Sequence, residues 1–219
     1  MSSAWRAAEY DYNASSYGRI SWSYTSSTMK DIVGVLALQG DFKEHLDVLT
    51  RLGIPALPVK LPSELKLVDR LIIPGGESTT IGKLLRRFKL LSPIRSRIKK
   101  GMPVWGSCAG AILLAKRVQG GTKDQVKIGV IDIVARRNAF GRQLDSFEVV
   151  LKMPKVTKKP VPVMFIRAPI FEKPGKNVEV LARLPDGKIV AAREGNILVT
   201  AFHPELTGAT ALHSYFTSL

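Results

Sequence analysis

The residues best suited to chemistry in this chain are one cysteine and a histidine–glutamate pair far downstream. Cys108 is the only cysteine among 219 residues. His203 and Glu205 follow an apolar segment and are separated by one proline. A thiol nucleophile needs a base that takes and returns its proton, and that base needs an acceptor to orient its other ring nitrogen. The three side chains therefore suit nucleophilic catalysis by a Cys–His–Glu triad.

The segment around Cys108 has the pattern of a nucleophile elbow. Gly106 and Gly110 flank the cysteine at two residues on either side, as in G-x-S-x-G with sulfur in place of oxygen. A sharp strand-to-helix turn crowds the backbone, and residues without Cβ relieve that crowding. The alternative is an inert thiol in the core, since free cysteine is among the most buried residue types. Likewise, His203 could be an ordinary surface histidine.

A glycine pair at Gly75 and Gly76 precedes a predicted helix. Its backbone N–H groups, together with the amide of Ala109, could form an oxyanion hole. A Gly-Gly turn is weak evidence by itself, and the segment lacks the spacing of a phosphate-binding Walker A loop. The other histidines, His45 and His213, are scattered, and we expect them to be structural or solvated. We expect no metal site, because the sequence has no paired Cys/His cluster, and no cofactor.

The elements that would position these residues alternate between strands and helices, which indicates parallel strands joined by crossover helices. The continuous apolar run at residues 32–38 is typical of a parallel strand buried on both faces. The first half is predicted to form strands at residues 32–38, 54–59 (an edge strand), 71–73 and 103–105, and helices at 42–52, 61–68, 78–88 and 93–99. The second half is predicted to form strands at residues 127–135, 146–151, 161–166, 178–182, 188–192 and 197–202, and a closing helix at 209–219.

Composition limits the class of protein. The length suits one α/β domain, which we place at residues 30–219, after an N-terminal extension at 1–29 that is expected to be disordered or not native. No apolar run reaches the roughly 18 residues of a membrane span, and a single cysteine excludes an internal disulfide, so we expect a cytoplasmic protein. The net charge of +15 is spread along the chain, and we expect a solvated basic surface or an acidic partner before a nucleic acid.

Several segments carry a resemblance to a known family. GSCAG at 106–110, FHPEL at 202–206 and PGGEST at 74–79 resemble the class I, triad-type glutamine amidotransferases. GVLALQGD at 34–41, RNAFGRQLDSFE at 137–148 and FIRAP at 165–169 resemble more closely the glutaminase subunits of pyridoxal 5'-phosphate synthase. The resemblance implies a three-layer α/β/α, flavodoxin-like domain with a mixed, largely parallel central sheet.

The resemblance also implies an activity: hydrolysis of L-glutamine to L-glutamate and ammonia through a γ-glutamyl thioester. Cys108 would be the nucleophile, His203 the base and then the acid, and Glu205 the residue that orients His203. The implied glutamine-binding residues are Gly76, Glu77, Ser78, Arg137, Ile166 and Arg167. The implied oxyanion donors are Gly75, Gly76 and Ala109. The sequence leaves open which arginine binds the α-carboxylate, or whether both are surface charges.

The resemblance further implies a partner. Ammonia would pass to a (β/α)8-barrel synthase subunit, in a family complex of twelve synthase and twelve glutaminase subunits, with Gln39 and Gly40 at the contact. Two alternatives remain at this point. One is the glutaminase of another pathway, such as imidazole glycerol phosphate synthase, and the other is a non-catalytic relative that acts as a binding protein.

Overall fold

The computed structural model describes residues 31–122, 125–140 and 146–219. The extension predicted at residues 1–29 lies outside the described residues, as does the middle of the segment at 137–148. No helix within the described ranges combines the length and the apolar character that crossing a membrane requires.

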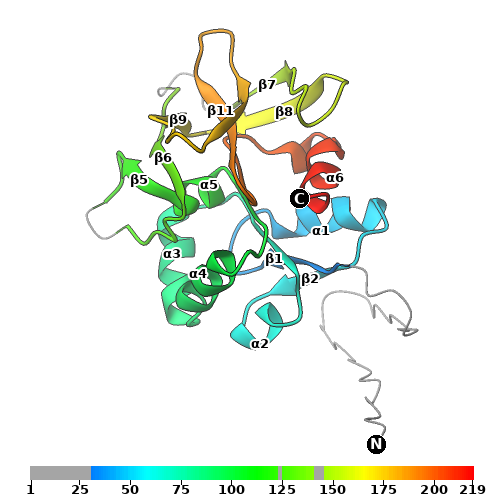
Figure 1. Ribbon diagram of the computed structural model, residues 1–219, viewed down its shortest axis with the longest axis vertical. Helices are drawn as coiled ribbons and strands as arrows, with labels where there is room; N and C mark the ends of the chain where they lie inside the picture. The colour runs from blue at the N-terminus through cyan, green and yellow to red at the C-terminus, as the bar shows by residue number, and fades with distance from the viewer. Residues whose placement is uncertain (1–30, 123–124, 141–145) are drawn as a thin grey trace, which may run out of the picture. The chain divides into compact units, whose positions relative to one another are not determined.

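A mixed, largely parallel sheet is the centre of the described residues (Figure 1). Its strand order is β2-β1-β3-β4-β12-β11-β9-β6-β5, and β10 pairs with β11. The strands β2, β1, β3, β4 and β12 run parallel to one another. Their bounds are β1 Val33–Leu36, β2 Ala56–Val59, β3 Arg70–Ile73, β4 Val104–Ser107 and β12 Ile197–Thr200. This arrangement confirms the predicted fold class and the edge position of β2.

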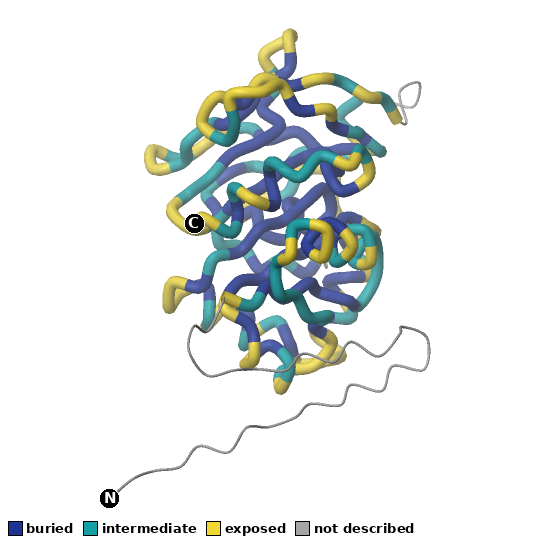
Figure 2. Tube along the Cα trace, turned by 90° about the vertical axis from the view of Figure 1, so that its right-hand side faces the viewer, coloured by how far each residue is buried: buried dark blue, intermediate teal, exposed yellow. Residues whose placement is uncertain are grey.

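Helices cover both faces of the sheet. In Figure 1, α1 and α6 lie on one side of the central strands, and α3 and α5 lie on the other. Figure 2 shows the buried trace running through the middle and the exposed segments at the turns. The bounds are α1 Phe42–Arg51, α2 Pro62–Leu65, α3 Ser78–Arg87, α4 Leu91–Lys99, α5 Ala109–Leu114 and α6 Ala211–Thr217, with a 3-10 helix η1 at Pro204–Leu206. Each predicted helix is present, and α2 and α6 are shorter than expected.

The second half of the chain adds strands that pair mostly antiparallel, although β5 pairs with β6 in parallel. Their bounds are β5 Ala115–Gln119, β6 Ile131–Arg136, β7 Ser146–Leu151, β8 Val161–Ile166, β9 Ile170–Glu172, β10 Glu179–Arg183 and β11 Ile189–Glu194. Neither β5 nor β9 was predicted, since β5 is short and partly charged and β9 has three residues. β7 and β8 form a separate two-stranded sheet, in which Phe147 and Phe165 stack with ring centroids 4.7 Å apart.

A polar cluster is buried between β4 and the helices α1 and α6. His45 and His213 are both fully buried, so of the two expected roles, structural or solvated, the structure agrees with the structural one. Nδ1 of His45 lies 2.9 Å from Nε2 of His213, and the Trp105 ring meets both imidazoles edge-on. Burial, together with the positive charge of Arg51, lowers the pKa of His213 to about 3. Burial and the neighbouring histidines lower the pKa of His45 well below its ordinary value.

These two neutral histidines predict a loss of stability in mild acid. Below about pH 6.5 the unfolded chain protonates both imidazoles, whereas the folded protein keeps His213 neutral down to about pH 3. The unfolded state therefore binds more protons, and stability falls as the pH drops through this interval. We expect a decrease of roughly 1 kcal/mol per pH unit for each histidine, measured by urea unfolding between pH 6.5 and 5. An equally steep decrease in the variant His213→Phe would contradict this origin.

Candidate active site

The turn after β4 places Cys108 directly before α5. Its φ of 45° is in the left-handed region, where residues other than glycine are uncommon. The flanking glycines explain how the turn closes. A Cβ on Gly106 would lie 2.5 Å from the carbonyl carbon of Gly110, and one on Gly110 would lie 2.0 Å from the carbonyl oxygen of Ile73. The predicted elbow is therefore present, and neither glycine has room for a side chain.

Neighbouring strands fix the backbone and thiol of Cys108. Its amide donates a hydrogen bond to the carbonyl oxygen of Thr200 at 2.8 Å, which ties the turn to the end of β12. Its Sγ lies 3.8 Å from the carbonyl oxygen of Ile166 at the end of β8. The side chain is nearly buried, with 7% of the residue exposed. Cys108 is thus held between the ends of two strands that are distant in sequence, by its amide at β12 and by its thiol at β8.

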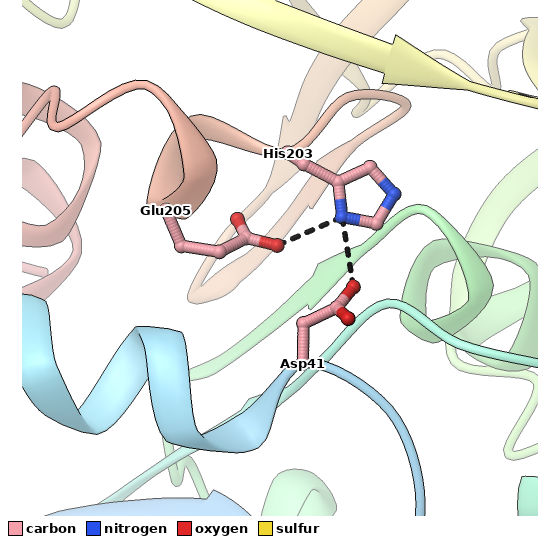
Figure 3. Close-up of side chains that lie close together, drawn as sticks. All are labelled: Asp41, His203 and Glu205. Atoms are coloured by element: carbon pink, nitrogen blue, oxygen red, sulfur yellow. Dashed lines mark hydrogen bonds and ion pairs between the residues drawn. The ribbon is translucent and has the colours of Figure 1, made fainter. Parts of the chain in front are cut away.

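His203 follows β12, and a hydrogen bond from its amide to Met164 on β8, 2.7 Å long, holds its backbone. Its Nδ1 lies 2.8 Å from Oε1 of Glu205, which the helix η1 carries (Figure 3). Both residues are buried. With Nδ1 facing a carboxylate, Nε2 is the nitrogen left for proton exchange, and Cys108 is among the neighbours that raise the pKa of His203. The structure thus brings the three predicted catalytic side chains together.

Asp41 is a fourth member of this cluster that the sequence reasoning missed. Its Oδ2 lies 3.1 Å from Nδ1 of His203, so two carboxylates meet one ring nitrogen (Figure 3). The ligand atoms of Asp41, His203 and Glu205 lie within 4.8 Å of one another, as in many metal sites. However, Nδ1 already bonds Glu205, so the geometry is that of an oriented imidazole. A signal was available, because Asp41 directly follows the loop after the first predicted strand.

The carboxylates set the electrostatics of the site. Burial lowers the pKa of His203, but hydrogen bonds with Asp41, Cys108 and Glu205 outweigh it and raise the pKa to about 12. Burial also raises the pKa of Glu205, and its hydrogen bond to His203 opposes that rise. The site therefore favours an imidazolium at His203, with a carboxylate on its Nδ1 side and the thiol on the other.

The Gly-Gly loop lies between His203 and the loop of Gln39 and Gly40. A Cβ on Gly75 would lie 2.1 Å from Cε1 of His203, and one on Gly40 would lie 1.7 Å from the Gly75 carbonyl oxygen. The amide of Glu77 donates to the side-chain oxygen of Gln39 at 2.8 Å. Gly76 has a φ of 146°, a conformation that glycine tolerates best. The predicted oxyanion loop and the predicted partner loop are therefore in direct contact.

The predicted glutamine-binding residues Glu77, Ser78 and Arg137 form one cluster. Arg137 lies 3.5 Å from Oε1 of Glu77 and donates to Oε1 of Gln125 at 2.9 Å. Gln125 in turn donates to the hydroxyl of Ser78 at 3.0 Å. The sequence reasoning missed Gln125, which stands in a polar loop with no motif around it.

Glu77 also begins the helix α3. Its carboxylate accepts hydrogen bonds from the amides of Thr79 at 2.9 Å and Thr80 at 2.6 Å. Burial raises the pKa of Glu77, but these bonds prevail and lower it to about 2. Glu77 is therefore a fixed anion beside Arg137. By contrast, the predicted Arg167 is exposed, with a φ of 42°, one residue beyond Ile166.

Comparison with known proteins defines the class. Residues 35–218 match the model of the SNO glutamine amidotransferase family, and the chain belongs to that family. It is similar to proteins named pyridoxal 5'-phosphate synthase subunit PdxT. The one from Roseiflexus sp. (strain RS-1) is 56% identical over 85% of this chain and 99% of that protein. The one from Herpetosiphon aurantiacus is 58% identical with the same coverage.

Solved structures agree with this assignment. A crystal structure of a glutamine amidotransferase covers 85% of this chain and 97% of its own, at 48% identity and a TM-score of 0.80. The structure of PurLQS from Thermotoga maritima, at 18% identity and a TM-score of 0.61 over 87% of this chain and 99% of its own, shares the fold. The resemblance inferred from the motifs is confirmed, and the relatives do not favour a glutaminase of another pathway.

The packing of the elbow predicts that Gly110→Ala is strongly destabilising. The new methyl group would overlap the backbone oxygen of Ile73, which cannot move without shifting β3. We expect a loss of about 3 kcal/mol in the free energy of unfolding, at the upper end for overpacking. Gly53→Ala is the control, because its Cβ meets open space and only its φ of 67° is strained, at a cost of roughly 1 kcal/mol. Equal losses in urea unfolding would contradict the steric explanation.

The carboxylates of Glu205 and Asp41 are expected to control the pKa of His203. Glu205→Gln and Asp41→Asn each remove a negative charge from Nδ1, so each should lower the pKa of His203 from about 12 toward 6.5, the ordinary value for histidine. Nitrogen-15 NMR of the ring nitrogens measures this pKa, with His203→Asn to assign the signals. An unchanged pKa in Asp41→Asn would show that Asp41 does not contact the ring in solution.

Proposed function

We propose that this chain hydrolyses L-glutamine to L-glutamate and ammonia, as the glutaminase subunit of pyridoxal 5'-phosphate synthase. The observation that carries the proposal is the convergence of Cys108, His203 and Glu205, with Nδ1 of the histidine 2.8 Å from the glutamate. Family membership and relatives named as subunits of that synthase support the same assignment.

The proposed reaction begins at the thiol. The raised pKa of His203 favours the ion pair in which the thiol proton has moved to the imidazole. Cys108 attacks the side-chain carbonyl carbon of glutamine, His203 returns the proton to the departing ammonia, and a γ-glutamyl thioester remains. Water, deprotonated by His203, then attacks the thioester, the C–S bond breaks to give glutamate, and the Cys108 thiolate is restored beside the protonated imidazole. Glu205 holds the N–H on Nδ1 and stabilises the imidazolium throughout.

The Gly75–Gly76 loop and the amide of Ala109 are the proposed donors to the oxyanion of the tetrahedral intermediate. For the amino-acid end of glutamine, we propose Arg137 as the partner of the α-carboxylate and Glu77 as the partner of the α-ammonium. Arg137 is held by Gln125 at 2.9 Å, and an arginine fixed in this way loses little side-chain freedom on binding a carboxylate. Ser78, Ile166 and Arg167 complete the proposed binding site.

The ammonia would pass to a (β/α)8-barrel synthase subunit, in a complex of twelve subunits of each kind, and residues 30–219 would form the whole amidotransferase domain. The proposed contact is the loop of Gln39 and Gly40. In support, this loop touches Gly75 and hydrogen-bonds Glu77. A partner that moved it would therefore also move the proposed oxyanion donors. We place the complex in the cytoplasm.

The test is ammonia release from glutamine, with and without the cognate barrel subunit. We expect release by the wild type with its partner and a loss of at least about a thousandfold in Cys108→Ala, because the nucleophile is gone. Arg137→Lys should raise KM about tenfold and change kcat little, since it weakens uniform binding. Absence of ammonia release by the wild type with its partner would refute the proposed activity.

A further inference from the structure

The second carboxylate oxygen of Glu205 faces an imidazole that the proposed mechanism does not use. Oε1 of Glu205 bonds His203, whereas Oε2 is buried and has no hydrogen bond of standard length within the described residues. Nε2 of His45 lies 3.5 Å from this Oε2, and both side chains are fully buried. A buried carboxylate oxygen without a donor is costly, so the protonation of His45 decides whether this contact is favourable.

The hydrogen bonds of the buried cluster assign that protonation. If His45 carried its proton on Nδ1, it would donate to His213, and the remaining proton of His213 would lie on its Nδ1. That atom is buried without a partner, and the lone pair on Nε2 of His45 would face Glu205. In the opposite assignment Nε2 of His213 donates to Nδ1 of His45, and the atom left over is only an acceptor. Orphaned N–H donors are the rarer of the two in proteins.

The second assignment places an N–H on Nε2 of His45, between two acceptors. These are the hydroxyl oxygen of Ser107 at 3.2 Å and Oε2 of Glu205 at 3.5 Å. Nε2 of His213 thus donates to Nδ1 of His45, and Nε2 of His45 points its N–H at Oε2 of Glu205. The orientation of His213 therefore fixes that of His45. Burial is the largest cause of the lowered pKa of each histidine; the charges of His213 and His203 add to it at His45, and that of Arg51 adds to it at His213, which agrees with neutral rings.

We propose that His45, held by His213, is a positioning residue that fixes Glu205 through its Oε2 so that Oε1 faces Nδ1 of His203. The inference rests on the proposed function of the triad. Fixing Glu205 matters here because Oδ2 of Asp41 lies 3.1 Å from Nδ1 of His203 and is a second acceptor for the same ring nitrogen. If Glu205 turned, His203 would follow the half-buried carboxylate of Asp41, and its Nε2 would no longer face Cys108.

The test compares His45→Leu, which removes the donor, with His45→Gln, whose side-chain amide can still donate to Glu205. Phe216→Leu is the matched control: Phe216 is fully buried against Trp105 but lies outside the hydrogen-bonded chain. Each full-length variant is assayed for kcat and KM of ammonia release with the barrel subunit. The rate of Cys108 alkylation by iodoacetamide is measured against pH on the free chain, and this readout does not depend on glutamine turnover.

We expect His45→Leu to lower kcat about 10- to 100-fold, the range typical for residues that orient a functional ligand, with KM nearly unchanged. The acidic limb of its alkylation profile should move about one unit to higher pH, because a misplaced Glu205 stabilises the imidazolium less well. His45→Gln should stay within about threefold of the wild type, and Phe216→Leu should lose stability but keep both the rate and the profile.

A wild-type kcat and alkylation profile in a folded His45→Leu would overturn the inference. So would equal losses in His45→Gln and His45→Leu, which would indicate a role in packing alone. If the wild type releases no ammonia with its partner, the proposed function fails, and the alkylation profile still decides whether His45 positions the triad. Should His45→Leu not fold, His213→Leu against His213→Gln gives the same comparison, since glutamine can replace the Nε2 donor.

Discussion

The site depends on one hydrogen bond in a nearly dry environment, between Nδ1 of His203 and Oε1 of Glu205 at 2.8 Å. Neither group would be stable there alone, because burial disfavours the charged form of each. Together they hold a proton between them and leave Nε2 free for the thiol. The strands β8 and β12 carry the backbone that makes this possible, through the bridge between Met164 and His203.

Close contacts of two glycines, neither of which has room for a Cβ, connect the His203–Glu205 pair with the loop after β1. Gly75 lies against the His203 ring, and Gly40 lies against Gly75. The Asp41 amide donates to the Gly75 carbonyl oxygen at 3.2 Å, and its carboxylate reaches His203. The loop after β1, the oxyanion loop and the proposed base therefore cannot move independently of one another. Such close packing converts a contact on the outer loop into a displacement at the site.

Much of the fold followed from local patterns. Continuous apolar runs indicated the parallel strands, and the order of strands and helices indicated the crossover topology. The strands β5 and β9 were not predicted because a short strand is decided by its pairing partners, not by its own residues. His45 and His213 illustrate the same limit. Each looked unremarkable within its own segment, and only the packing of α1 and α6 against Trp105 buries them together.

The sequence by itself determined the chemistry: one thiol on an elbow, a histidine and glutamate after a strand, and motifs specific enough to indicate the family. Those features depend on residue type and short spacing, which are local. The tertiary structure decided the surroundings of that chemistry. It placed Asp41 beside Glu205 on one ring nitrogen, joined Gln125 to Arg137, and put His45 behind the glutamate. These contacts span 12 positions, between Gln125 and Arg137, to 162 positions, between Asp41 and His203, and only the folding of strands and helices against one another brings such residues together.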